Sequence, residues 1–187
     1  MITLYYITRI LTFFGTECRC AFEHIACRIL KLPIEDTRTF KDSELCGHIE
    51  HELAPTLGKA FFVCWFPFTL NCLLACCFLY SGAYRIVYAG DYSSLASWLF
   101  LWLGFSFAAN VFPTYEDALA LKDALYGGKN LAAKILLAPF FGVVYAGAFI
   151  ERYSLTMLTS LAFTIAFPYI FTVTFPFFED IQQMLLQ

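Results

Sequence analysis

The sequence predicts an all-α polytopic membrane protein with about five helical membrane segments in one domain, residues 1–187. The chain is 60% hydrophobic and 14% charged, whereas soluble domains carry about 25% charged residues. Its mean hydropathy is +0.66, and the apolar residues form long blocks, which is typical of membrane spans. A net charge of −3 without a basic run argues against nucleic acid as a partner.

The five segments are expected at residues 2–32, 60–80, 94–112, 131–150 and 153–177. Each of the last four is long enough to cross about 30 Å of hydrocarbon. The first carries several charges, so one of its faces must contact protein or water, and it either spans the membrane or enters and returns. A short amphipathic helix is expected before Gly127-Gly128, and a short interfacial helix at residues 178–187.

Lysine and arginine are concentrated in and around the loop of residues 33–59 and the connection of residues 113–130. The positive-inside rule then predicts that both lie in the cytoplasm, with the N-terminus outside and the C-terminus inside the cytoplasmic (inner) membrane. The expected partners are the lipid bilayer and other membrane proteins or further copies of the chain. Four of the eight cysteines lie in the apolar run of residues 60–80, where cysteine behaves as a small hydrophobe.

The stretch HIEHELAP, residues 48–55, resembles a zinc-protease helix that lacks its last ligand. In H-E-x-x-H the two histidines share one helical face and hold zinc, and the glutamate is the general base. Here Pro55 occupies the position of the second histidine. His48 and His51 are spaced i, i+3 and would converge on a metal only if the stretch were helical. We favour a polar interfacial loop.

A second group of possible ligands lies in ECRCAFEH, residues 17–24. The thiols of a helical Cys-x-Cys point about 200° apart, which is poor for joint chelation. Arg19 and Glu23 are i, i+4 neighbours, and pairing is the least costly way to bury both charges, so an ion pair is favoured over a metal site. Asn71 and Asn110, within or at the end of apolar segments, are expected to form hydrogen bonds between helices.

Several stretches resemble, in the same order, motifs of a small polytopic membrane metalloprotease-like family of bacteria and archaea, loosely akin to the site-2 proteases. They are HIACRILKLP (24–33), GHIEHE (47–52), PFTLN (67–71), WLGFSFAANVFPTYEDA (102–118) and LLAPFFGVVYAG (136–147). The family's H-E-L-x-H falls on Arg19-Cys20-Ala21-Phe22-Glu23, so both histidines and the catalytic glutamate are replaced. Its later histidine falls on Asn110.

The resemblance implies a protein without catalytic residues or metal, which acts as a scaffold or binding subunit in a membrane complex. The vestigial site would comprise Arg19, Glu23, His51, Glu52, Asn110 and Asp117. The alternative hypothesis is a membrane metalloprotein or metalloprotease with zinc in a relocated site. Its ligands would come from Glu23, His24, His48 and His51, with Cys18 or Cys20. A transporter is disfavoured, because the last four segments carry no charge in their middles.

Overall fold

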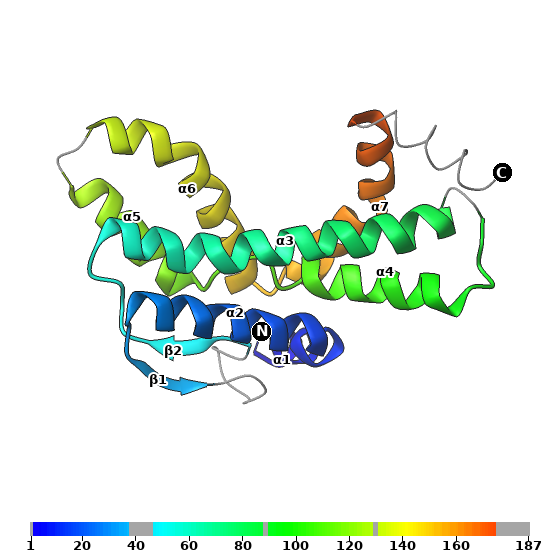
Figure 1. Cartoon of the computed structure of the whole chain (residues 1–187), viewed down its shortest axis with the longest axis horizontal. Coiled ribbons are helices and arrows are strands. Elements are labelled where there is room, and N and C mark those ends of the chain that lie inside the picture. The colour runs from blue at the N-terminus through cyan, green and yellow to red at the C-terminus, as the bar shows by residue number, and fades with distance from the viewer. Residues whose placement is uncertain (1, 38–46, 88–89, 129–130, 175–187) are drawn as a thin grey trace.

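The long helix α3 organises the fold. The structure is a computed structural model that describes residues 2–37, 47–87, 90–128 and 131–174. Helix α3 contacts α2, α4, α5 and α7, and α2 and α4 lie along it on the side away from α6 (Figure 1). The elements are α1 Ile2–Leu11, α2 Phe13–Leu30, β1 Ile34–Thr37, β2 Ile49–His51, α3 Leu57–Val87, α4 Leu95–Ala108, α5 Tyr115–Gly127, α6 Leu131–Arg152 and α7 Thr156–Thr174.

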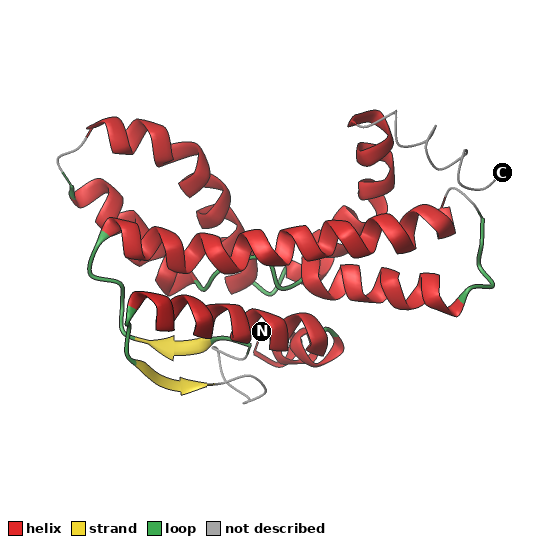
Figure 2. Ribbon diagram, viewed as in Figure 1, coloured by secondary structure: helices red, strands yellow, loops and turns green. Residues whose placement is uncertain are grey.

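The predicted all-α class is confirmed, with one addition (Figure 2). The loop of residues 33–59 contains an antiparallel two-stranded sheet, in which Ile34 faces His51 and Thr37 faces Ile49. Sequence reading missed these strands because they are only four and three residues long. The predicted amphipathic helix is present as α5, whereas the predicted tail helix lies outside the described residues.

The number of membrane spans differs from the prediction. Among the described residues, α3, α6 and α7 are long and apolar enough to cross a membrane. Helix α4 has 14 residues and is therefore about 21 Å long, less than the thickness of the hydrocarbon core. The first segment is divided at Thr12 into α1 and α2. The prediction of about five spans is therefore not confirmed.

Capping residues define where the helices beside the site begin and end. Helix α2 ends at Lys31, which adopts a left-handed conformation with φ 53°. The N–H of Leu32 then donates to the carbonyl of Cys27 at 2.9 Å, as in a Schellman motif. Helix α5 begins after Thr114, whose hydroxyl oxygen accepts from the N–H of Asp117 at 3.1 Å.

Helices α3 and α4 pack closely because glycine occupies their contact. A methyl group at Gly82 would lie 2.4 Å from the backbone nitrogen of Leu101, and one at Gly104 would lie 2.8 Å from that of Leu79. Small residues of this kind allow apolar helices to approach each other and gain van der Waals contact. Asn71, in contrast, donates to the carbonyl of Pro67 in its own helix at 3.0 Å. The predicted interhelical role of Asn71 is therefore wrong.

We predict that Gly82→Ala lowers the free energy of unfolding by about 2 kcal/mol, because the added methyl overlaps backbone that cannot move aside cheaply. The measurement is thermal unfolding in detergent. Gly142→Ala is the matched control, since nothing lies within 4 Å of a methyl at this helical position. It should leave the melting temperature unchanged or raise it, because alanine is the better helix former. Equal effects of both substitutions would contradict close packing at Gly82.

Candidate functional site

A group of titratable side chains is buried where α1, α2, the start of β2 and the end of α6 meet. Each has at most 4% of its surface exposed. Burying charge in this way costs several kcal/mol per ion unless partners compensate it. Segments far apart in the chain supply the compensation here. We call this group the charged cluster, and its members are Arg9, Arg19, Glu23, His48 and Glu151.

The cluster converges on Glu151, in the last turn of α6. One of its carboxylate oxygens forms an ion pair with Arg9 and accepts a hydrogen bond from the Tyr5 hydroxyl at 3.2 Å. The same oxygen lies 2.6 Å from Nε2 of His48. The other oxygen lies 3.5 Å from Nη1 of Arg19. The guanidinium groups of Arg9 and Arg19 therefore both contact the buried Glu151 carboxylate and stabilise its negative charge.

Glu23 is the second buried carboxylate of the cluster. Its Oε1 accepts a hydrogen bond from Nε of Arg19 at 2.9 Å, one helical turn away, which confirms the predicted ion pair. The same oxygen lies 3.0 Å from Nδ1 of His48, and Oε2 accepts from the backbone N–H of Ile49 at 3.1 Å. Glu23 therefore joins α2 to the start of β2.

His48 connects the two carboxylates. Nδ1 faces Glu23 and Nε2 faces Glu151, both at hydrogen-bond distance. A neutral imidazole carries one N–H, so it could donate to only one of them. One imidazole therefore bridges carboxylates that come from two distant helices, α2 and α6.

Asn110 links the charged cluster to the end of α4. Its Oδ1 accepts hydrogen bonds from Arg9 and from the hydroxyl of Thr16, the latter at 3.1 Å. Its Nδ2 donates to the hydroxyl oxygen of Thr12 at 3.0 Å. The predicted interhelical role of Asn110 is confirmed, because one amide joins the α1–α2 connection to α4.

Two glycines allow the cluster to assemble. A methyl group at Gly15 would lie 2.2 Å from the carbonyl oxygen of Ser106, so only glycine allows α2 and α4 to approach this closely. Gly47 has φ 84°, a conformation that L residues rarely adopt, and a methyl there would lie 2.9 Å from Thr16. Its backbone directs the following residue, His48, into the interior.

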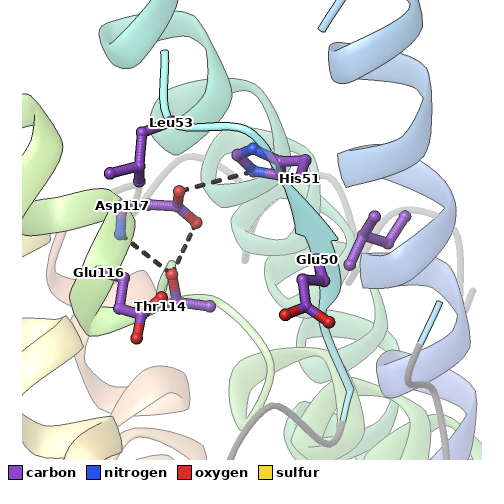
Figure 3. A pocket seen from close by; sticks show the side chains of 7 residues that line it. Glu50, His51, Leu53, Thr114, Glu116 and Asp117 are labelled. Atoms are coloured by element: carbon purple, nitrogen blue, oxygen red, sulfur yellow. Dashed lines mark hydrogen bonds and ion pairs between the residues drawn. The ribbon is translucent and has the colours of Figure 1, made fainter. Parts of the chain in front are cut away.

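A second polar group adjoins the cluster at the surface. Nε2 of His51 lies 3.5 Å from Oδ1 of Asp117, and Nδ1 lies 2.9 Å from the carbonyl of Glu52. Oδ2 of Asp117 accepts from the Thr114 hydroxyl at 2.7 Å, which fixes the carboxylate (Figure 3). This group therefore joins β2 and α5.

The neighbours of His51 change its proton affinity. Burial would lower the pKa of His51, but the nearby Cys27 side chain, the Asp117 carboxylate and the Glu52 carbonyl together outweigh it and raise that pKa to about 10. Burial raises the pKa of Asp117, against the opposing effects of His51 and Thr114. His51 is therefore an imidazolium at neutral pH.

The six vestigial residues divide between the two groups. Arg19, Glu23 and Asn110 lie together, with Nη1 of Arg19 3.4 Å from the carbonyl oxygen of Asn110. His51 and Asp117 form the second pair. Glu52 contributes only its backbone carbonyl, and the residue is exposed.

HIEHELAP is not helical. Residues 49–51 form strand β2, so His48 and His51 are separated and join different groups. The i, i+3 convergence, which requires a helix, is therefore excluded. The favoured interpretation of a polar loop is correct only in part, because His48 is 1% exposed and stabilises the interior.

The residues present do not fit a zinc site. Among the described residues, no three histidine, cysteine, aspartate or glutamate side chains are arranged to hold a metal ion. Glu23, His48 and Glu151 face one another, but Arg9 and Arg19 donate to the carboxylate oxygens that a metal would need. The alternative set of zinc ligands, which includes His24 and His51, does not come together among the described residues. A cation placed here would meet two guanidinium groups.

The sequence analysis does not predict two residues of the charged cluster, Arg9 and Glu151. Arg9 is one of several charges in the first segment, and Glu151 directly follows the segment expected at residues 131–150. Both are charges beside long apolar runs, and such charges usually pair. That signal could have suggested the Arg9–Glu151 pair.

We predict that Arg19→Met lowers the free energy of unfolding by about 3–5 kcal/mol, because it leaves buried carboxylate charge uncompensated. Glu23→Met should cost a similar amount. The double variant should cost less than the sum of the two, since the second substitution removes the charge that the first left unpaired. Thermal unfolding in detergent measures the cycle. Additive losses would contradict coupling between the two side chains.

We predict a midpoint near 10 for the proton NMR titration of His51, and a lower midpoint in Asp117→Asn. The folded-state pKa lies above the unfolded value of about 6.5. The stabilisation from His51 is therefore complete below about pH 6.5 and is lost as the pH rises through about 10. The difference in melting temperature between wild type and His51→Gln should shrink over that range. A difference independent of pH would contradict this assignment.

Comparison with known proteins assigns no family to this chain. No family model, no curated protein and no solved structure matches it. Function must therefore be argued from the residues of the charged cluster and of the adjoining group around His51.

Proposed function

We propose that the chain is a membrane-embedded scaffold or binding subunit that resembles a membrane metalloprotease but has no catalytic metal. The observation that carries this proposal is the Arg19–Glu23 ion pair at 2.9 Å. It occupies the positions onto which the resemblance maps the two zinc-binding histidines. Arginine carries a permanent positive charge and has no lone pair for a metal. A protein in which this pair replaces the ligands acts by binding rather than by hydrolysis.

The compensation of charge within the cluster supports this proposal. Glu23 and Glu151 receive hydrogen bonds or ion pairs from arginine, histidine, tyrosine and backbone N–H groups, so no carboxylate oxygen is left free for a metal or an attacking water. Catalytic zinc sites need about three protein ligands and an open position. In the cluster, arginine side chains take the place that a metal and its open position would need. The cluster also holds α1, α2, the start of β2 and the end of α6 together.

The outer helices support a position in the membrane. Among the described residues three helices are long and apolar enough to span a bilayer, and α6 and α7 in particular expose large apolar side chains. We propose a cytoplasmic-membrane protein with the N-terminus outside, the C-terminus inside and up to five embedded segments. Its partners would be lipid and other membrane proteins or further copies of itself. The exposed residues include Leu131, Ile135, Leu136, Phe140 and Val143 on α6, and Leu158, Leu161, Ile165, Tyr169 and Val173 on α7.

We predict that the protein, purified from native membranes without a histidine tag, carries far less than one zinc per chain. Elemental analysis measures the metal directly. A combined variant, Arg19→His with Cys20→Glu and Glu23→His, restores the H-E-x-x-H pattern and should gain zinc. In the matched control Glu23 is kept, so that only one of the two histidine ligands is restored and no zinc should be gained. One zinc per chain in the unmodified protein contradicts the proposal, whether or not the variants fold.

A further inference from the structure

Helix α2 has an outer face that points away from the charged cluster. Its inner face carries Arg19 and Glu23 and packs against α3, α4 and the two strands. On the outer face, residues alternate in steps of three and four, the spacing that places side chains on one side of a helix. Four of these residues are exposed and one, a histidine, is half-buried. We call them the α2 stripe: Phe14, Glu17, Ala21, His24 and Arg28.

The charged side chains of the α2 stripe have no partner within the described part of the chain. Neither an ion pair nor a hydrogen bond joins the side chain of Glu17, His24 or Arg28 to another described residue. Glu17 and Arg28 cannot pair with each other, since eleven residues of helix separate them by about 16 Å. In water such charges would be solvated. Their cost therefore depends on where α2 lies relative to the membrane.

The direction of α2 places Glu17 at the level of the middle of α3. Leu30, the last residue of α2, lies at the start of α3, because its carbonyl oxygen accepts from Nζ of Lys59 at 2.9 Å. From there α2 lies along α3 (Figure 1). Glu17 is thirteen residues before Leu30, which is about 20 Å along the helix axis. Helix α3 has 31 residues and is about 46 Å long, so Glu17 lies near its midpoint.

This level is costly for an exposed carboxylate. Helix α3 is long and apolar enough to cross a membrane, and in the membrane position proposed above its midpoint lies near the centre of the bilayer. Ionisable side chains at that depth almost always face protein or a water-filled cavity and pair with an opposite charge. The inference below rests on that proposed position. It requires that protein rather than lipid covers Glu17.

A second copy of the chain does not fit this surface. Two copies inserted in the same direction would be related by a two-fold axis along the membrane normal. Their α2 helices would then lie parallel, with the two Glu17 side chains facing each other at one level and the two Arg28 side chains at another. Like charges repel, and they do so most strongly in low-dielectric surroundings. Complementary charge therefore requires a different chain.

We propose that the α2 stripe binds a transmembrane helix of another membrane protein, which places a lysine or arginine against Glu17 at the middle of the bilayer. Phe14 and Ile25 lie on either side of the acid along α2, are 41% and 45% exposed, and provide apolar contact. Ala21, one turn from Glu17, lets the partner helix approach closely, as small residues do between membrane helices. Arg28, near the end of α2, favours an acidic residue towards one end of the partner helix.

The test uses the purified protein, reconstituted in phosphatidylcholine vesicles, and three synthetic transmembrane peptides. The peptides are leucine–alanine helices that differ at one central position, which is lysine, leucine or glutamate. Fluorescence energy transfer from a donor on the protein to an acceptor on the peptide measures association. We expect the lysine peptide to bind about 10-fold more tightly than the leucine peptide, the scale of a polar contact between membrane helices. The glutamate peptide should bind least.

Substitution of Glu17 tests whether this side chain causes the preference. Glu17→Gln should abolish the preference for the lysine peptide, and Glu17→Lys should transfer it to the glutamate peptide. Glu35→Gln is the matched control and should change nothing, because Glu35 is also exposed but lies in β1. Equal binding of the three peptides, or a preference that survives in Glu17→Gln, would overturn the proposal. Self-association of the wild-type chain that depends on Glu17 would do the same.

Retention in the membrane separates this inference from the proposed function. Alkaline carbonate releases peripheral proteins from native membranes and leaves embedded ones in place. Retained protein that does not distinguish the three peptides contradicts only the binding inference. Release by carbonate overturns both, since Glu17 would then lie in water. The melting temperatures of the Glu17 variants should match that of the wild type, because the side chain is exposed. Lost binding is then not lost fold.

Discussion

The compensation of buried charge between α1, α2 and α6 is the interaction on which the rest of the structure depends. Arg9 and Arg19 are both 1% exposed, and an unpaired guanidinium at such depth would cost several kcal/mol. Glu151 can compensate them only if the end of α6 lies against α1 and α2. Because Glu151 is more than 130 residues from either arginine, this requirement determines much of the chain's path.

The same compensation limits what the cluster can do chemically. A metal site needs free lone pairs on its ligands, and here the carboxylate oxygens accept from protein donors, with His48 lying between them. In a low-dielectric interior such a network is stable only when all its members are satisfied. The cluster is therefore suited to holding segments together and poorly suited to releasing and rebinding a ligand.

The group around His51 differs from the charged cluster in its position and in the elements that supply its members. It lines a small pocket, and its members come from a strand and from the start of a helix. Sequence patterns are weak at such places, because each residue belongs to a different element. The two histidines of this short stretch reach different groups because the chain is extended from Ile49 to His51. In an extended chain, side chains an odd number of residues apart point to opposite faces.

The sequence by itself determined the apolar helices and the local pair Arg19–Glu23, because hydropathy blocks and i, i+4 spacing depend on neighbours in the chain. It also placed α5, whose end is marked by two glycines. Only the tertiary structure decided that α4 stops short of a full span, that Glu151 completes the cluster and that His51 meets Asp117. These features depend on contacts between distant segments. These contacts are stabilised because charged and polar groups are buried together with their partners. The spacing of residues along the chain does not show which partners will meet.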